Sequence, residues 1–404
     1  MSAKRKTTVA VIFGGRSVEH DVSVVTGNQI MRAFDAERFE IVPIYITRDG
    51  RWFTGEALWE LGNYKNEITS HKGVEQVILS PSTNHHGLII NPVVGRFQKN
   101  TVQRIDVVFP AVHGSHGEDG TLQGLFELAD IPYVGGGVLG SAIANDKVIT
   151  KTILRQHNIP VVPDVMFTRA DWLEKPDELI QKIQNTLTYP LFVKPATLGS
   201  SIGVGRVNDE TMLRTSIEVA TRFDRRVLVE SAVTDCFEIN CAVMGNGNQI
   251  EPSVLEQPVS WEQFLTYEEK YMRGNEGMKS AQRLIPAPIN PELTTLIKNY
   301  AVEAFKAIDG RGTARIDFLV RGNEVYLNEI NTMPGSLAFY LWHEVGMTSQ
   351  QVVEKLVRLA QDAYADKRRS TYDYQTDLIS LTARRGLKGV KGTKVPSSVR
   401  STDN

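Results

Sequence analysis

The feature that most constrains the fold is a short apolar run near the N-terminus, Val9–Phe13, which ends at Gly14-Gly15. Its β-branched and aromatic residues are typical of a buried strand, and the two glycines indicate a turn directly after it. Residues 23–34 then follow helical spacing, and residues 40–46 form a second strand-like run. Because a strand, a helix and a second strand in this order make up a parallel α/β unit, the sequence predicts an α/β fold whose N-terminal part holds a parallel sheet.

A further buried strand is predicted at residues 106–112, and it too runs into a glycine-containing loop, residues 113–120. Parallel sheets bind ligands beyond the carboxyl ends of their strands, where this loop and the first turn both fall. Glu19 lies in the first of these loops and His113 in the second. A zinc site is not expected, because His113 and His116 have no convincing third ligand.

From about residue 145 the chain changes character. A helix at residues 146–157 comes first, and two apolar runs, 190–193 and 202–207, predict a hairpin around a Gly-Ser-Ser loop. Strands dominate after residue 227, and a helix at 351–366 closes this part. The expected strands are 227–230, 238–244, 316–320 and 325–330, with a helix at 292–307 between them. At 404 residues the chain is long enough for two or three domains.

Composition argues against several classes of protein. A net charge of −2 gives no support for nucleic-acid binding, and no apolar stretch reaches the roughly 18 residues of a membrane span. Cys236 and Cys241 are the only cysteines, and their spacing suggests neither a disulfide framework nor a zinc site, so a cytoplasmic location is expected. Residues 366–404 carry nine Lys or Arg and four Asp, which predicts a flexible tail or, alternatively, a polyanion-binding one.

The strongest local signal is a pair of apolar runs that carry acidic residues, ARIDF and YLNEIN. Glu329 and Asn331 are two apart on one predicted strand and share a face, and Asp317 lies on a strand that could pair with it. Such oxygen ligands suit Mg²⁺ bridging to nucleotide phosphates. Arg315 shares the face of Asp317 and could meet a phosphate, and Gly335 could bring a backbone N–H to an oxyanion. A hairpin with ordinary salt bridges is the alternative.

A second group of residues fits phosphate binding. Lys194 ends a predicted strand and precedes the small-residue loop with Ser200 and Ser201, whose backbone N–H groups could hold an anion. A Walker A motif is absent, and a tight hairpin is the structural alternative. Glu230 and Glu238 lie on later strands. Each could form a salt bridge, or contact an adenine and a ribose respectively.

Together these segments resemble the D-alanyl-D-alanine ligase family of the ATP-grasp superfamily over residues 7–365. The motifs that carry the resemblance are GGRSVEHDVS, VHGSHGEDGTLQG, VKPATLGSSIGV, TYEEKY, ARIDF and NEINTMPG. Their order and spacing make the set far more specific than any single motif.

The resemblance implies a reaction and an architecture. ATP phosphorylates the carboxylate of a first D-alanine, and the amine of a second attacks the acyl phosphate, for peptidoglycan precursor synthesis. An N-terminal α/β substrate domain is expected at residues 1–140, with ATP clamped between a central domain at 141–226 and a C-terminal domain at 227–365, followed by the tail at 366–404. A homodimer is the usual state of the family.

The resemblance also assigns roles by position. The ATP-binding residues are Lys147, Lys194, Ser201, Glu230, Val233 and Glu238. The ligands of Mg²⁺, for which Mn²⁺ is a potential substitute, are Asp317, Glu329 and Asn331. The catalytic residues are Glu19, Ser200, Tyr271, Arg315 and Gly335. The substrate contacts are His113, Lys270, Ser336 and Tyr340.

Two segments bear on the second substrate. The loop with Lys270 and Tyr271 resembles the dipeptide-forming branch of the family, which favours an amine acceptor over a hydroxy acid. In the family a serine five residues after the glycine of NTxPG holds the acceptor carboxylate, but Tyr340 stands there in this chain. Its hydroxyl could still donate a hydrogen bond, or its bulk could reshape the pocket. D-Alanine is the expected acceptor; D-serine or another amino acid, and a non-catalytic ATP-binding regulator, are the alternatives.

Overall fold

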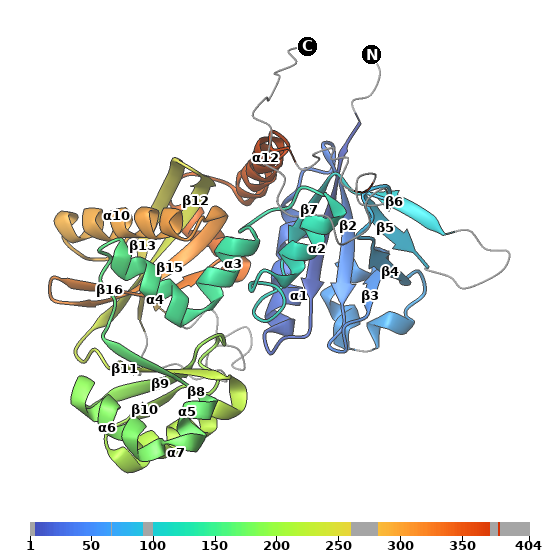
Figure 1. Ribbon diagram of the computed structural model, residues 1–404. Helices are drawn as coiled ribbons and strands as arrows, with labels where there is room; N and C mark the ends of the chain where they lie inside the picture. The colour runs from blue at the N-terminus through green and yellow to red at the C-terminus, as the bar shows by residue number, and fades with distance from the viewer. Residues whose placement is uncertain (1–4, 66, 92–99, 260–281, 372–378, 380–404) are drawn as a thin grey trace. The chain divides into compact units, whose positions relative to one another are not determined.

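The computed structural model of the chain describes residues 5–65, 67–91, 100–259 and 282–371, together with Ile379. Residues 1–364 form one compact unit and residues 365–404 a second. The first unit contains a seven-stranded, a four-stranded and a five-stranded sheet. Figure 1 shows helices packed beside each of these sheets. The expected α/β class is confirmed.

The seven-stranded sheet has the order β6-β5-β4-β3-β2-β1-β7. Its centre is parallel, because β1 (Thr7–Gly14) pairs in parallel with both β2 (Phe39–Ile46) and β7 (Val107–Pro110). Helix α1 (His20–Ala33) connects β1 to β2, so the predicted parallel unit is confirmed, with a helix that begins three residues earlier than expected. The other strands pair antiparallel at one edge: β3 (Trp52–Thr54), β4 (Glu75–Leu79), β5 (Gly87–Ile90) and β6 (Thr101–Arg104).

Ser23 fixes the carboxyl ends of the two central strands. It lies in the first turn of α1, where serine commonly caps a helix. Here its buried hydroxyl instead accepts a hydrogen bond from Gly14 N at 2.8 Å and donates one to Ala111 O at 2.6 Å. The ends of β1 and β7, where the two candidate loops begin, are thereby held together.

The four-stranded sheet has the order β10-β9-β11-β8 and is antiparallel throughout. The predicted hairpin is confirmed as β9 (Leu191–Pro195) paired with β10 (Gly205–Val207). The other strands are β8 (Asp164–Thr168) and β11 (Arg226–Ser231). The associated helices are α5 (Arg169–Glu174), α6 (Pro176–Thr186) and α7 (Glu210–Phe223). The predicted domain boundary at residue 227 falls within β11, and the proposed division of the chain into domains stays a prediction.

The five-stranded sheet has the order β14-β13-β12-β15-β16 and is also antiparallel. Its strands are β12 (Phe237–Asn246), β13 (Gln249–Val259), β14 (Gln282–Leu284), β15 (Arg311–Arg321) and β16 (Glu324–Asn331). The apolar face of α10 (Pro291–Ala307) packs against this sheet around Ile297, Ala301 and Phe305. The opposite face of the sheet is thus the one that can carry polar side chains.

The remaining described elements are 3₁₀ helices and α-helices. The 3₁₀ helices are η1 (Glu56–Trp59), η2 (Leu61–Lys65), η3 (Ile68–Ser70) and η4 (Gly335–Ala338). The remaining helices are α2 (Thr121–Ala129), α3 (Val138–Asn145), α4 (Lys147–Gln156), α11 (Phe339–His343) and α12 (Ser349–Lys367). The helices expected at residues 146–157, 292–307 and 351–366 are confirmed as α4, α10 and α12.

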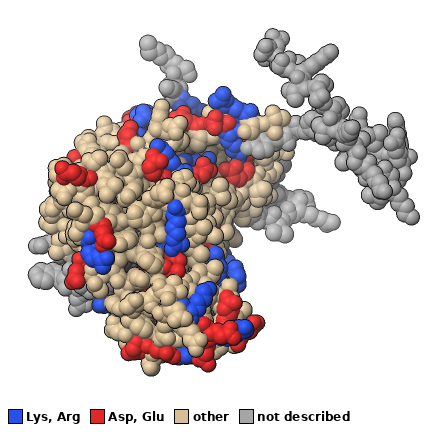
Figure 2. Space-filling model, turned by 60° about the vertical axis from the view of Figure 1, so that its left-hand side comes forward, with Lys and Arg blue, Asp and Glu red and all other residues tan. Residues whose placement is uncertain are grey.

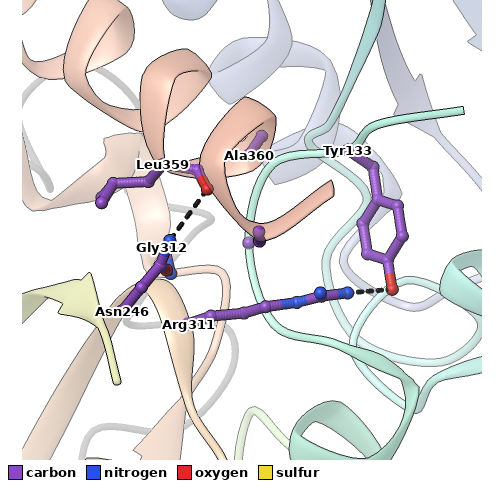
Figure 3. Close-up of a pocket in the computed structure, with 8 residues that line it drawn as sticks. Tyr133, Asn246, Arg311, Gly312, Leu359 and Ala360 are labelled. Atoms are coloured by element: carbon purple, nitrogen blue, oxygen red, sulfur yellow. Dashed lines mark hydrogen bonds between the residues drawn. The ribbon is translucent and has the colours of Figure 1, made fainter. Parts of the chain in front are cut away.

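A narrow hollow marks a junction between elements, shown in Figure 3. Arg311 at the start of β15 donates to the hydroxyl of Tyr133, and Asn246 donates from Nδ2 to Leu359 O at 2.8 Å. The residues that line the hollow include no carboxylate. We therefore regard it as a structural contact between β12, β15 and α12 rather than as a candidate site.

The surface agrees with the near-neutral composition. On the face drawn in Figure 2, acidic and basic side chains are interspersed, as a net charge of −2 leads one to expect. Within the described part of the chain, no helix has both the length and the apolar character needed to cross a bilayer.

Candidate active site

The two acidic strands pair as the sequence predicts. In the register of β15 and β16, Arg315 lies opposite Asn331 and Asp317 opposite Glu329. The amide of Asn331 donates to Asp317 Oδ2 at 3.0 Å and to Glu329 Oε1 at 3.4 Å. Two carboxylates and one amide therefore converge on one point of the polar sheet face.

Arg315 is held by its neighbour on the strand. Its Nε and Nη2 donate to the two oxygens of Asp317 at 2.7 and 2.6 Å, a bidentate pair. The Asp317 side chain is 3% exposed and that of Arg315 is 24% exposed. Burial, together with the Glu238 and Glu329 carboxylates, raises the pKa of Asp317 to about 7 against the opposing effect of Arg315. The site thus crowds negative charge around one guanidinium.

Asn240 connects the ribose candidate to this cluster. It lies opposite Asp317 in the register of β12 and β15. With its amide nitrogen turned toward the carboxylates, Asn240 donates to Glu238 Oε1 and to Asp317 Oδ1, each at 3.0 Å. Glu238 therefore lies on the same polar face as the predicted metal ligands.

A buried cluster with one carboxylate and two ammonium groups lies at the end of the four-stranded sheet. Glu230 on β11 pairs with Lys194 from β9 and with Lys151 from α4, and the side chains of Glu230 and Lys151 are each 3% exposed. Burial alone would raise the pKa of Glu230, but the two lysines outweigh it and lower this pKa to about 2. Lys194 also donates to Asn328 Oδ1 on β16 at 3.4 Å, which links the cluster to the five-stranded sheet.

Lys147 is the first residue of α4. This helix begins there because the side chain of Asp146 accepts hydrogen bonds from the backbone N–H groups of Val148 and Ile149. Lys147 Nζ donates to Leu198 O at 2.6 Å, in the loop that also carries Ser200. Burial lowers the pKa of Lys147, while the Glu329 carboxylate opposes this shift. The ammonium therefore lies between the small-residue loop and the carboxylate cluster.

Of these groups, Lys147, Glu329 and Asn331 line an open cleft of about 620 Å³. Its polar lining comes from three parts of the chain. The residues are Glu19 and Glu118 from the N-terminal loops, Lys147 and Ser200 from the middle of the chain, and Asn328, Glu329 and Asn331 from β16. The cleft thus joins most of the predicted motifs in one place.

Glu19 and Ser200 meet within this cleft, although 181 positions separate them. Glu19 is the N-cap residue of α1, but its side chain makes no capping bond. Instead it accepts a hydrogen bond from Ser200 Oγ. Ser200 and Ser201 have φ values of 53° and 59°, a left-handed backbone that turns the loop toward the cleft. Glu19 and Ser200 are therefore in direct contact, and their catalytic roles stay a prediction.

Glu118 also lines the cleft and fixes the turn with Gly335. Its carboxylate accepts hydrogen bonds from Gly114 N and Met333 N, both at 2.8 Å. Burial, followed by repulsion from Glu19, raises the pKa of Glu118 to about 8. Gly335 then has open space where a side chain would begin, so its backbone is accessible.

His113 is buried, with 4% of its surface exposed. Its Nε2 lies 2.9 Å from Thr26 Oγ1, and the same hydroxyl accepts from Ser336 N at 3.3 Å. Burial lowers the pKa of His113 to about 4, so the imidazole is neutral at pH 7. His113 and Ser336 thus meet through Thr26, and a direct contact of His113 with a substrate stays a prediction.

Tyr340 lies on α11, beyond an unusual turn. Ser336, Leu337 and Ala338 have φ values between 49° and 51°, which is costly for residues other than glycine and is often seen at functional sites. The Tyr340 hydroxyl donates to Glu256 Oε2 at 2.5 Å. The turn therefore directs this ring onto the polar face of the five-stranded sheet.

Comparison with known proteins decides the family. Residues 8–136 match the D-ala D-ala ligase N-terminus and residues 153–358 the D-ala D-ala ligase C-terminus. A D-alanine--D-alanine ligase of Thermosipho africanus is 40% identical over 374 residues, 92% of this chain and 98% of that protein. One of Natranaerobius thermophilus is 39% identical over 376 residues, 92% of this chain and 99% of that protein. The chain belongs to the D-alanine–D-alanine ligase family.

Solved structures agree with this family assignment. The VanG D-Ala:D-Ser ligase from Enterococcus faecalis matches with a TM-score of 0.76 and 31% identity, covering 88% of this chain and all of that one. The D-alanine-D-alanine ligase from Coxiella burnetii matches with a TM-score of 0.74 and 29% identity, covering 95% of this chain and 99% of that one. The ATP-grasp fold of the D-alanine–D-alanine ligase family, expected from the motifs, is confirmed.

For the remaining predicted site residues the structure gives few contacts. Lys270 and Tyr271 lie outside the described residues. Val233 follows β11, and its carbonyl accepts a hydrogen bond from Cys236 Sγ at 3.1 Å. Among the described residues, no group of three or more His, Cys, Asp or Glu could hold a metal ion, so the predicted magnesium set depends on the amide oxygen of Asn331.

The sequence reasoning missed several residues of the site. Lys151 lies four positions after Lys147 and hence on the same face of α4, a spacing that could have identified it. Glu118 lies within the motif VHGSHGEDGTLQG, but the sequence analysis predicts no contact for it. Glu256 and Arg283 carried no recognisable signal, because only the pairing of β12, β13 and β14 brings them to this face.

Proposed function

We propose that this chain is an ATP-dependent D-alanine–D-alanine ligase that forms D-alanyl-D-alanine through an acyl phosphate, for peptidoglycan precursor synthesis. The observation that carries the proposal is the cleft of about 620 Å³, which is lined by the Glu19–Ser200 pair, by Lys147 and by Glu329 with Asn331. An anionic group suited to a substrate ammonium thus faces groups suited to nucleotide phosphates. Membership of the ligase family supports the same reaction.

Nucleotide phosphates would lie against Lys147 and Lys194. Both are cations near the loop with Ser201, whose backbone adds N–H donors. Asp317, Glu329 and Asn331 would hold Mg²⁺, or Mn²⁺ in its place, because carboxylate and amide oxygens are hard ligands. The two carboxylates already lie against the Asn331 amide, which would turn its oxygen toward the ion in place of the nitrogen that donates to them. When bound, the ion would supply positive charge that neutralises the phosphates.

The other ATP contacts are assigned by motif position. Glu230 would accept from the adenine amino group, the backbone of Val233 would contact the same ring, and Glu238 would bind the ribose. Glu230 is buried and fixed by two lysines, which supports a role that needs an oriented carboxylate. Glu238 lies on the face of the metal ligands through Asn240, as a ribose near the phosphates requires.

The donor D-alanine would bind in the cleft. Glu19, oriented by Ser200, would fix its ammonium group, while Tyr271 and Lys270 would add contacts from the loop outside the described residues. Ser336 and His113 would lie near its carboxylate. The Thr26 hydroxyl, which contacts both residues, would keep them together. Arg315 and the N–H of Gly335 would stabilise the charge that develops at the transferring phosphate and at the tetrahedral carbon. Water must be kept away from the acyl phosphate.

A second candidate function changes only the acceptor. Tyr340 is far larger than the serine expected at its position, and it contacts a buried carboxylate rather than open space. One structural relative is described as a D-Ala:D-Ser ligase, which supports testing D-serine beside D-alanine. We further propose that the chain forms a homodimer, which is the usual state of the family. The two cysteines suggest no disulfide framework, which supports a cytoplasmic location.

The experiment is a coupled ADP-release assay with D-alanine, D-serine, D-lactate and L-alanine, with product masses measured. ADP release that depends on D-alanine and yields the dipeptide mass is the expected result. A mixed dipeptide formed in preference to D-alanyl-D-alanine would favour the second candidate. ATP binding without phosphate release would contradict both and favour a regulatory protein.

A further inference from the structure

A second polar cluster lies on the same sheet face as the predicted magnesium ligands. In the strand registers, Glu256 on β13 lies opposite Asn240, Asn240 opposite Asp317, and Asp317 opposite Glu329. Directly opposed residues of neighbouring strands share a face. Glu256 is therefore two strands from Asp317, about 10 Å at the usual strand spacing. The row therefore connects Glu256 to the predicted magnesium ligands along one face of the sheet.

Arg283 joins the row from the edge strand β14. It pairs with Pro258, two residues from Glu256 and hence on the same face. Its Nη1 donates to Glu256 Oε1 at 2.8 Å, and its guanidinium lies 4.4 Å from the centre of the Tyr340 ring. Tyr340 and Glu256 therefore hold the Arg283 guanidinium from two sides.

The Tyr340 hydroxyl is already used. A phenol has one proton to donate, and that of Tyr340 goes to Glu256 Oε2 at 2.5 Å. Sequence reasoning left open that this hydroxyl holds the acceptor carboxylate. Because this proton is already donated to Glu256, Tyr340 is placed to position Glu256 and Arg283. The carboxylate of the acceptor then needs another hydrogen-bond donor.

Among the described residues beside Tyr340, Arg283 is a cation that can still bind an anion. Two nitrogen atoms of Arg315 already donate hydrogen bonds to Asp317. Arg283 has five N–H donors, and within the described part of the chain Glu256 is its only hydrogen-bond partner. Its side chain is 39% exposed, whereas that of Glu256 is 1% exposed. An incoming anion would therefore meet the guanidinium rather than the buried carboxylate.

We propose that Arg283 binds the α-carboxylate of the acceptor amino acid, with Glu256 and Tyr340 as positioning residues for its guanidinium. The proposal rests on the proposed ligase function and deepens it by naming the group that selects an acceptor with a free carboxylate. A guanidinium matches a carboxylate as a two-pronged donor, and one fixed in advance by a buried carboxylate and an aromatic ring loses little freedom on binding.

The test compares two acceptors in competition, D-alanine and D-alaninamide, which lacks the carboxylate charge. D-Alanine also occupies the donor site, and the masses of the two products separate the acceptors. Arg283→Met should raise KM for the second D-alanine by about 10- to 100-fold, the scale of a lost charge-assisted contact. It should also remove most of the preference for D-alanine over D-alaninamide. KM for ATP and for the first D-alanine should stay unchanged.

Matched variants keep the result interpretable. Arg321→Met makes the same change in a surface arginine of β15 that pairs with Glu324, and it should leave the acceptor preference intact. Arg283→Lys should restore part of the preference, because it retains the charge. Arg283→Met leaves the buried Glu256 carboxylate without its cation, which could disturb the site by itself. The acceptor preference is therefore also compared between Glu256→Gln and the double variant Glu256→Gln/Arg283→Met, which both lack the Glu256 charge.

The outcomes separate the two proposals. An unchanged preference for D-alanine in Arg283→Met, in either background, would overturn the assignment while wild-type dipeptide synthesis still supported the ligase function. Tyr340→Phe should have the smaller effect. If it abolished the preference while Arg283→Met did not, the tyrosine hydroxyl would be the carboxylate ligand and the proposal would be wrong. Absence of dipeptide from the wild type would instead refute the ligase function.

Discussion

Replacing Glu230 with Gln should destabilise the folded chain strongly. This substitution keeps the shape of the side chain but removes the charge that two buried lysines share. The carboxylate has a pKa of about 2 in the folded chain, compared with 4.5 for an ordinary glutamate. At about 1.36 kcal/mol per pKa unit, this difference corresponds to about 3 kcal/mol of stabilisation.

The sign of this contribution sets its pH range. Because the folded-state pKa is lowered, the stabilisation is fully present above pH 4.5 and is lost as the pH falls toward 2. The difference between wild type and variant should therefore be the same at pH 6 and at pH 8. Burial lowers the pKa of Lys151 despite its attraction to Glu230, so the lysines offset part of this gain and about 2–3 kcal/mol is a fair expectation.

The assay is guanidinium denaturation followed by circular dichroism, without nucleotide, with the midpoint and slope measured for each protein. Lys151→Met is the matched control. Glu230 keeps Lys194 in that variant, so a smaller loss than that of Glu230→Gln is expected. A loss below about 1 kcal/mol for Glu230→Gln, or equal losses for the two variants, would refute the reasoning.

Three further predictions concern the metal ligands, His113 and Ser23. Glu329→Gln should lower phosphate release by about 100-fold or more at saturating ATP, as expected when a charge-stabilising group is lost, and near-normal turnover across a Mg²⁺ titration would defeat the metal assignment. Burial lowers the pKa of His113 to about 4 in the folded chain, below the ordinary value of 6.5. As the pH falls, the unfolded chain therefore binds a proton at His113 before the folded chain does, and the free energy of unfolding should fall by about 2 kcal/mol between pH 7 and pH 5. Denaturation midpoints should show that His113→Asn loses this part of the pH dependence; an unaltered pH profile would contradict it. Ser23→Ala leaves the buried N–H of Gly14 without its acceptor and should cost about 1–3 kcal/mol in the same assay. A change too small to measure would mean that the hydroxyl does not hold β1 to β7.

Elements whose partners are close in sequence could be predicted well. The strands with Asp317 and Glu329 are consecutive, so alternation of side chains and a short turn suffice to pair them. The first strand, helix and strand likewise follow from local apolar patterns. The sequence alone therefore predicts the convergence of two carboxylates and an amide.

Contacts between distant segments could not be read in this way. The bond of Ser200 to Glu19 spans 181 positions, and that of Tyr340 to Glu256 spans 84. A local pattern identifies an exposed or buried position but not which distant group will face it. Glu230 illustrates this, since its strand was predicted while the two lysines that fix its charge were not paired with it.

The sequence by itself determined the fold class, the family, and the candidate ATP and magnesium residues, because motifs and periodicity are properties of short stretches of chain. The tertiary structure decided what each polar group contacts. It gave the Tyr340 hydroxyl to Glu256, placed Thr26 between His113 and Ser336, and left Arg283 as a partly exposed cation beside the buried Glu256. These pairings depend on how sheets and helices from distant parts of the chain pack, and burial then requires each polar group to find a partner among whatever that packing supplies.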